Sequence, residues 1–228
     1  MDSTKMRLLV IGATGGIGRA LLAQGAARGH AMTAFVRSPR KLDGAPRDVA
    51  VVQGDPLDAA ELAPAMAGHD AVLSALGPPG PGATTIHRDG ARATIAAMET
   101  AGVARLVIMS AAILFDIDGL LYAVMRRTLL KNIVVDCGAM ETIVTASDRN
   151  WTIVRPPRLT NGPLTRRYAA ADARLPDGWR GSISRADVAH YVLDEAECRE
   201  RSRRIVGLAA TATTTRVSDA MRDSSARS

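Results

Sequence analysis

The sequence has few aromatic side chains and only two cysteines. Phe, Trp and Tyr together make up 3% of the 228 residues, so the stacking platforms that many nucleic-acid-binding proteins use are scarce. The basic residues are scattered, and we therefore expect no nucleic-acid partner in spite of the net charge of +6. Cys137 and Cys198 form neither a metal-binding spacing nor a disulfide framework, which favours a reducing, cytoplasmic setting and no metal site.

Long apolar runs are also missing. No stretch is long enough to span a bilayer and no signal-peptide pattern precedes the first apolar segment, so we expect no membrane association. Hydrophobic residues nevertheless make up 47% of the chain, which suits a single α/β domain with an aliphatic core. We expect this domain to cover residues 1–210, with small substrate-side elements at its C-terminal end, and a flexible tail at 211–228.

A glycine cluster near the N-terminus lies between a strand pattern and a helix pattern, in the segment RLLVIGATGGIGRALLAQGAARG at 7–29. In such a turn the first glycine lets the chain leave the strand sharply, the second lets the backbone approach a diphosphate, and the third lets the helix pack closely. Gly12, Gly15 and Gly18 occupy these positions. Free amides at the helix start would then face the anion, so the segment predicts a dinucleotide site. A glycine-rich loop that only turns the chain is the alternative.

The residues after the second expected strand, 31–36, indicate which dinucleotide binds. An NAD site usually has Asp or Glu there to accept hydrogen bonds from the ribose, whereas this chain has Arg37 and Ser38, with Arg40 and Lys41 nearby. A guanidinium and a hydroxyl suit a 2′-phosphate, which a carboxylate would repel. We therefore predict NADP(H) as the cofactor, with a solvated basic loop as the alternative for Arg40 and Lys41.

Strand and helix patterns alternate along the rest of the chain. The other expected strands lie at 49–53, 71–75, 105–109, 151–155 and 204–208. One expected helix follows the strand at 49–53 and ends at 67. The later expected helices lie at 87–101, 128–147 and 185–195. This alternation predicts a Rossmann-type doubly wound parallel sheet with helices on both faces. We expect a short hairpin or loop at 168–179.

A proline-containing segment after the strand at 151–155 resembles one particular family. It runs P-P-x-x-x-N-x-P-L-T-x-x-Y from Pro156 to Tyr168. Together with GATGGIG and GDPLD, it is similar to the atypical short-chain dehydrogenases/reductases, the NAD(P)H-binding family typified by biliverdin-IXβ reductase/flavin reductase. The resemblance covers nearly the whole chain. It implies a cofactor site made of Gly12, Thr14, Gly15, Gly16, Ile17, Arg37, Ser38, Asp55, Pro56, Leu57, Leu76, Gly77, Ser110 and Pro156.

The same resemblance implies catalytic candidates. Ser110 leaves the strand at 105–109, and Arg158 stands where the family's flavin reductase has a histidine. We expect Arg158 to anchor an anionic substrate or to stabilise an oxyanion, with a salt-bridged structural arginine as the alternative. If the following helix is anchored on Met140 and Glu141, the positions of the Tyr-x-x-x-Lys pair of ordinary short-chain dehydrogenases hold Ile133 and Cys137, and the pair is missing. Tyr122 is a candidate proton donor, with packing at the edge of an apolar segment as the alternative.

These residues predict an NADPH-dependent oxidoreductase that passes a hydride to a planar conjugated acceptor: a flavin, a quinone, a tetrapyrrole or an aromatic polyketide. Such acceptors need less acid catalysis than a plain ketone, which suits a chain without the Tyr-Lys pair. Two alternatives stay open: a non-catalytic NADP(H)-binding redox sensor, and an isomerase or lyase that keeps its cofactor. We expect a monomer or a weak homodimer that binds a small aromatic or conjugated substrate.

Overall fold

The computed structural model describes residues 5–78, 80, 82–116, 124, 126–128 and 130–211. The strands are β1 (Arg7–Ile11), β2 (Ala31–Val36), β3 (Ala50–Gln53), β4 (Ala71–Ser74), β5 (Arg105–Met109), β6 (Asn150–Arg155), β7 (Arg158–Thr160), β8 (Tyr168–Asp172), β9 (Ser182–Ser184) and β10 (Arg204–Ala210). The helices are α1 (Gly16–Ala27), α2 (Ala59–Met66), α3 (Ile86–Ala101), α5 (Lys131–Thr145) and α6 (Arg185–Cys198), with short 3₁₀ turns η1 (Pro39–Leu42) and η2 (Ala112–Leu114).

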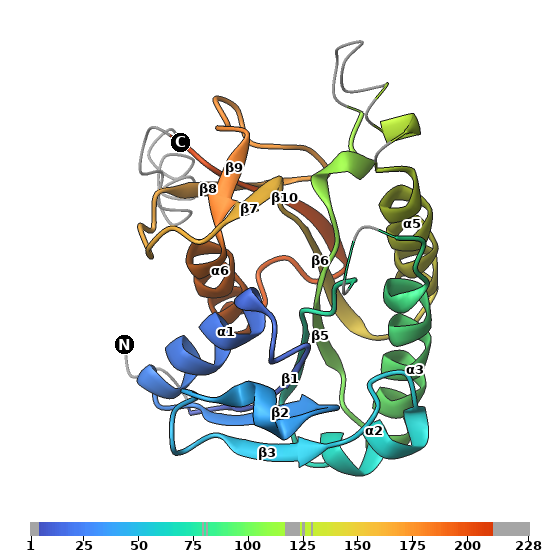
Figure 1. Ribbon diagram of the computed structural model, residues 1–228, viewed down its shortest axis with the longest axis vertical. Coiled ribbons are helices and arrows are strands. Elements are labelled where there is room, and N and C mark those ends of the chain that lie inside the picture. Colours follow the sequence, from blue (N-terminus) through green and yellow to red (C-terminus); the bar gives the residue numbers. More distant parts are fainter. Residues whose placement is uncertain are drawn as a thin grey trace, which may run out of the picture.

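The centre of the molecule is a sheet of eight strands in the order β3-β2-β1-β4-β5-β6-β10-β8 (Figure 1). All neighbours in it pair in parallel except β8, which is antiparallel to β10. The chain starts in the middle of the sheet at β1, builds outward to β3, and then returns to the other side of β1 at β4. This is the Rossmann-type doubly wound fold that the alternating patterns predict, and its strand order reverses between β1 and β4.

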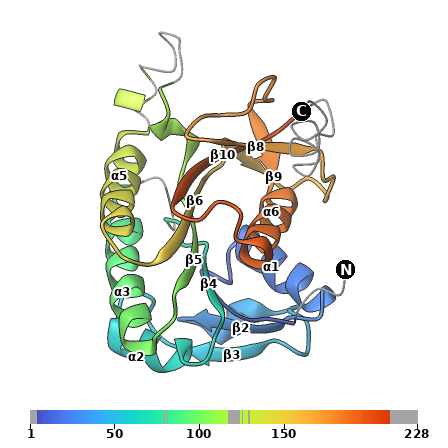
Figure 2. The same ribbon diagram turned by 180° about the vertical axis from the view of Figure 1, so that it is seen from behind.

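Helices cover both faces of the sheet. α1 and α6 pack together on one face, whereas α2, α3 and α5 lie side by side on the other (Figures 1 and 2). Each face has its own aliphatic core. Leu8 and Val10 of β1 belong to the core under α1 and α6, while Leu9 and Ile11 belong to the core under the other three helices. A strand buried on both faces is expected to be apolar, as Leu8, Leu9, Val10 and Ile11 of β1 are.

A network of charged side chains joins α6 to the end of α1. Arg28 Nη1 lies 2.7 Å from Asp194 Oδ1 and 2.9 Å from Glu197 Oε1. The buried His30 accepts a hydrogen bond at Nδ1 from Met6 N, so its Nε2 carries the proton and donates to Glu197 over 2.8 Å. Burial alone would raise the pKa of Glu197, but the hydrogen bonds from His30 and Arg28 hold that pKa below its usual range.

The structure corrects the expectation for 168–179. Tyr168–Asp172 forms neither a hairpin nor a loop but β8, which pairs with β10 at the edge of the main sheet. The local pattern was misleading because the partner strand lies much further along the chain. β7 and β9 add a small parallel sheet of two strands, and the helix expected at 128–147 begins only at Lys131. Within the described ranges, no helix is both long and apolar enough to cross a bilayer.

Candidate functional site

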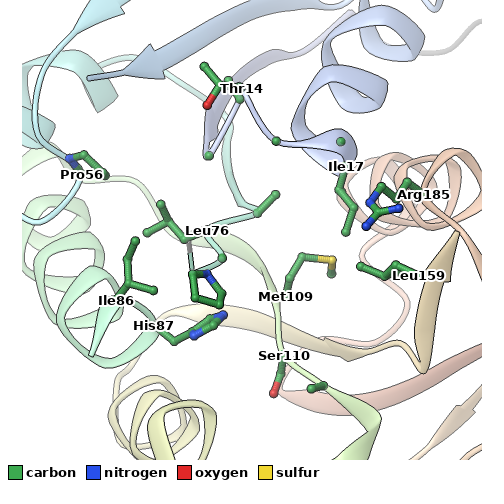
Figure 3. A pocket seen from close by; sticks show the side chains of 18 of the residues that line it. Thr14, Ile17, Pro56, Leu76, Ile86, His87, Met109, Ser110, Leu159 and Arg185 are labelled. Carbon is green, nitrogen blue, oxygen red and sulfur yellow. The ribbon is translucent and has the colours of Figure 1, made fainter. Parts of the chain in front are cut away.

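A crevice of about 540 Å³ opens at the carboxyl ends of β1, β4 and β5, beside the point where the strand order reverses. This volume lies within the usual range of small-molecule sites. In Figure 3, Thr14 and Ser110 lie at opposite ends of the crevice, with His87 and Arg185 on opposite sides. An elongated ligand can therefore contact α1, α3 and the end of β5 together.

The glycine turn after β1 forms the floor of one end of the crevice. Gly12 has a φ of +77°, a conformation that favours glycine, and a Cβ on it would lie 2.5 Å from the carbonyl oxygen of Ala75. A Cβ on Gly18 would lie 2.6 Å from Ala13 Cα and closer still to the carbonyl oxygen of Gly12. These contacts explain why the turn needs glycine at both positions: one reverses the chain and the other lets α1 sit directly on the turn.

The N-terminus of α1 is left open to a ligand. Gly15 is its N-cap, and no side chain among the described residues caps this end or places a carboxylate in the first turn. Gly15, Gly16 and Ile17 all line the crevice. The amides and the positive end of the helix dipole are thus available to an anion, and a dinucleotide diphosphate fits this end of the site.

Two cations lie at the end of the crevice nearest β2. Arg37 directly follows β2, Lys41 lies in η1, and both residues line the crevice. Arg19 fixes this segment to the glycine turn: its guanidinium donates to the carbonyl oxygens of Thr14 over 3.1 Å and Asp43 over 2.9 Å, and also to that of Lys41. The loop that carries both cations is thereby held beside the diphosphate end of the site.

Ser110 lines the opposite end of the crevice, after β5. Its hydroxyl donates to Glu141 Oε1 over 2.6 Å. Glu141 also accepts from Arg155 Nε over 2.9 Å and lies 2.5 Å from Arg155 Nη2, while the Arg155 guanidinium stacks 4.5 Å from the centre of the Phe115 ring. The network holds Ser110 in place, and it commits the single hydroxyl proton to a carboxylate. The oxygen of Ser110 remains able to accept a hydrogen bond from a ligand.

Ile133 and Cys137 also line the crevice, so the places of the missing Tyr and Lys do face the site. Burial, assisted by the carboxylates of Asp136 and Glu141, raises the pKa of Cys137 to about 12. The thiol therefore stays protonated at neutral pH and is a poor nucleophile. This wall of the crevice holds neither the acid nor the cation that an ordinary short-chain dehydrogenase has there.

Sequence reasoning gave no role in the site to His87 and Arg185, two of the polar residues that line the crevice. His87 is the second residue of α3, and its Nδ1 lies 2.9 Å from Asp136 Oδ2. Arg185 opens α6, approaches Gly16 and donates to Asn161 Oδ1 over 2.7 Å. Both line the crevice. A signal for His87 was present, because a helix that follows a parallel strand begins at the carboxyl edge of the sheet, where ligands bind.

The structure brings most of the predicted site residues together. Those that line the crevice are Gly12, Thr14, Gly15, Gly16, Ile17, Arg37, Pro56, Leu76, Gly77, Ser110 and Pro156. Those described outside its lining are Ser38, Asp55, Leu57 and Arg158. Asp55 Oδ1 accepts a hydrogen bond from Leu57 N over 3.0 Å, and Arg158 is exposed on β7. Tyr122 and the residues of the predicted tail from 212 onward lie outside the described ranges.

Comparison with known proteins identifies similar chains. A family model described as NAD(P)H-binding matches residues 12–198. The Bacillus subtilis protein named "Uncharacterized sugar epimerase YhfK" is 31% identical over an alignment of 210 residues that covers 86% of this chain and 92% of that protein. YwnB, also from Bacillus subtilis, is 34% identical over 109 residues, so the chain spans only 48% of its length.

Solved structures share the fold over nearly their whole length. A "putative NADH-flavin reductase" from Streptococcus pneumoniae matches with a TM-score of 0.75 at 25% identity, covering 90% of this chain and 100% of that chain. A "putative exported protein" from Burkholderia pseudomallei matches with a TM-score of 0.76 at 27% identity, covering 90% and 99%.

Proposed function

Because the chain belongs to the NAD(P)H-binding family, we propose that it is an NADPH-dependent reductase of planar conjugated acceptors such as flavins, quinones, tetrapyrroles or aromatic polyketides. The observation that carries the proposal is the polarity of the crevice. Its α1 end offers uncapped amides, its β2 end offers Arg37 and Lys41, and its β5 end is largely apolar around Ser110. A nucleotide with a phosphorylated ribose at one end and a reactive ring at the other suits this layout.

The chain's own residues bind and orient the cofactor, which supplies the hydride when bound. In this proposal the glycine turn and the first amides of α1 hold the diphosphate, and Arg185 approaches it from α6. Arg37 and Lys41 hold the 2′-phosphate, for which a guanidinium is well suited. Ser110 and Pro156 border the nicotinamide. Predicted contacts of the adenosine include Ser38, Asp55 and Leu57, which are close in sequence to lining residues.

The character of the β5 end favours a conjugated acceptor. Met109, Ala111, Ile133 and Leu159 supply apolar lining there, which suits a flat ring system. The protonated Cys137 offers no charge to activate a plain ketone. An acceptor that spreads negative charge over its own conjugated system depends less on such help.

A second candidate is an epimerase or other isomerase that keeps its cofactor bound. The observation in its favour is the relative named as a sugar epimerase, 31% identical over 92% of that protein's length. Against it, Ile133 lines the crevice at the place expected for the tyrosine base of a short-chain dehydrogenase, and no tyrosine is among the described residues of the lining. The two candidates differ in one measurable respect, since an isomerase consumes no NADPH overall.

The test is NADPH oxidation by the purified protein, followed by absorbance, with FMN, FAD, menadione and biliverdin as separate acceptors. The proposal predicts turnover with at least one acceptor and slower turnover when NADH replaces NADPH. Tight NADPH binding without turnover of any acceptor would instead support a redox sensor. Conversion of a nucleotide sugar without NADPH loss would support the isomerase. Reactions without protein measure the spontaneous rate, which must be subtracted for flavins and quinones.

The proposal includes a cytoplasmic location and a monomer or weak homodimer. Both cysteines are free thiols, which suits a reducing compartment. The similar Burkholderia protein is named as a "putative exported protein", which does not agree with a cytoplasmic location. Cell fractionation therefore tests where this protein is found. Light scattering at several concentrations measures the oligomeric state.

A further inference from the structure

His87 and Asp136 form a pair at the wall of the crevice. Neither residue has a part in the proposed binding of the nucleotide. Nδ1 of the imidazole lies 2.9 Å from Asp136 Oδ2, and the backbone amides of His87 and Arg88 donate to the same carboxylate over 3.1 and 3.0 Å. The side chain of Asp136 is 2% exposed and that of His87 is 10% exposed. α3 and α5 are thus joined at a nearly buried carboxylate that accepts three hydrogen bonds.

The contact with Asp136 determines which nitrogen of His87 can serve a ligand. A carboxylate only accepts hydrogen bonds, so Nδ1 carries a proton and donates it. Nε2 is then the nitrogen left for the crevice, and it makes no hydrogen bond with a described residue. Figure 3 shows the ring directed from α3 toward the segment of Met109 and Ser110. A carboxylate that holds one imidazole nitrogen fixes the tautomer and orients the ring.

The pair lies at an end of the crevice where neither Cys137 nor Ser110, the other proton-bearing side chains described there, is free to act as an acid. Cys137, next to Asp136 in the chain, occupies the expected lysine position, and its raised pKa keeps its proton in place. The hydroxyl proton of Ser110 is committed to Glu141. Among the described residues that line this end of the crevice, an imidazole is the side chain best able to release and regain a proton near neutral pH.

We propose that His87 is the proton donor of the crevice and that, with Asp136, it replaces the missing Tyr-Lys pair. The inference rests on the proposed reductase function. A quinone acceptor takes a hydride from the nicotinamide, which leaves NADP⁺ and gives the acceptor an anionic oxygen. That oxygen takes the proton from Nε2 of the imidazolium, which completes the hydroquinone. His87 keeps its Nδ1 proton, which stays hydrogen-bonded to Asp136, and water returns a proton to Nε2.

The first test reads the histidine itself. The chain has four histidines, so imidazole ¹H–¹⁵N correlation spectra of the labelled protein can be assigned with H87Q. We expect His87 to carry its neutral-state proton on Nδ1, and its Nε2 signal to shift on addition of NADP⁺ and again with menadione. D136N is expected to weaken the tautomer preference. A His87 signal that neither ligand moves would overturn the proposal.

The second test compares two acceptors that differ in their need for a proton. Hydride transfer to menadione, which is neutral, produces an anion, whereas transfer to the cation methylene blue produces a neutral dye. We expect H87Q to lower kcat with menadione by about 10²- to 10⁴-fold, the usual contribution of general acid catalysis. Turnover of methylene blue is expected to change less than about threefold, because that step needs no donor. H69Q, the same substitution outside the crevice lining, serves as the matched control and should change neither rate.

The outcomes separate the two hypotheses. If the wild-type protein oxidises NADPH with none of FMN, FAD, menadione, biliverdin and methylene blue, the reductase proposal fails and the role of His87 fails with it. If it reduces some of these acceptors but not menadione, only the assignment of His87 as the donor to a quinone is overturned. If the wild type is active and H87Q retains menadione turnover, or loses both acceptors equally, only the assignment of His87 as donor is overturned. Thermal melting of H87Q must match the wild type, and the spectra of the wild-type protein provide an independent result if it does not.

Discussion

Replacing Arg37 by alanine is expected to change which nucleotide the crevice prefers. Arg37 follows β2 directly and lines the crevice together with Lys41, and the segment RSPRKL at 37–42 contains no acid. A ribose phosphate carries a charge of about −1.5 to −2 near neutral pH and accepts paired hydrogen bonds from a guanidinium. NADH lacks this phosphate, so only the affinity for NADPH should fall.

The size of the effect follows from the exposure of Arg37. A hydrogen bond to a charged group contributes about 1.5–3 kcal/mol. The Arg37 side chain is exposed, so water and salt screen it, and the lower half of that range applies. We expect a loss of about 1.5–2 kcal/mol, which is a 10- to 30-fold higher Kd for NADPH. R37A and K41A together should lose less than the sum of the two, because the proposal places both cations against the same phosphate.

Fluorescence titration with NADPH and with NADH measures the two affinities in the same buffer. R40A is the matched control: Arg40 lies in the same basic loop and is exposed, but it does not line the crevice. It should change the Kd for NADPH less than about threefold, and higher ionic strength should reduce the advantage of NADPH over NADH. Equal weakening of both nucleotides in R37A, or no weakening of either, would refute the assignment of the phosphate to Arg37.

Other predictions concern packing, thiol chemistry and acid stability. G18A is expected to lower the free energy of unfolding by about 1–3 kcal/mol, because the added Cβ overpacks the turn. G138A has open space around its Cβ and should raise that free energy by about 0.5–1 kcal/mol. Urea denaturation measures both, and equal changes would contradict the packing argument. The exposed Cys198 should react with a thiol reagent in the folded protein, while Cys137, with its pKa of about 12, should react only after unfolding; rapid labelling of both would contradict the burial. A carboxyl whose pKa is lowered on folding contributes stability above its unfolded pKa, about 4.3 for Glu, and loses it as the pH falls through the folded value. Thermal melts at falling pH should therefore show a shallower loss for E197Q than for the wild type, and identical slopes would exclude Glu197 as a source of the loss.

The parts of the fold that could be predicted depend on residues close together in the chain. The apolar run in β1 predicted a buried strand, and both faces of that strand are indeed buried. Gly102 ends α3 in the left-handed conformation, as its place after the helix pattern indicates. β8 was wrongly expected to be a hairpin or loop because its partner is β10. Which edge a strand joins depends on the edges that the rest of the sheet leaves open, and no local pattern contains that information.

The same distinction applies to the candidate site. The glycine turn acts through backbone geometry, so its spacing alone predicts a close approach to an anion. Ser110 was predicted as a catalytic candidate, but its sequence position does not show that its hydroxyl donates a hydrogen bond to Glu141, 31 residues further on. His87 was assigned only to a helix, since its possible role arises from Asp136, 49 residues away, and from the crevice that both helices border. Roles that depend on one side chain meeting another across helices or strands could not be read from the chain alone.

In the proposed function, the order of the strands also decides the orientation of the nucleotide, that is, which end of the crevice holds its phosphorylated ribose and which holds its reactive ring. β2 and β3 are on one side of β1, and β4, β5 and β6 are on the other. The loop with the two cations follows β2, whereas Ser110 and Pro156 follow β5 and β6. A phosphorylated ribose drawn to the cations therefore directs the reactive ring toward β5, past the uncapped end of α1. An acceptor must then stack over the apolar residues near β5 and β6, on the side of the crevice where His87 lies. R37A and H87Q consequently test the two ends of one ligand, and the first should alter nucleotide affinity without the acceptor-dependent loss expected of the second.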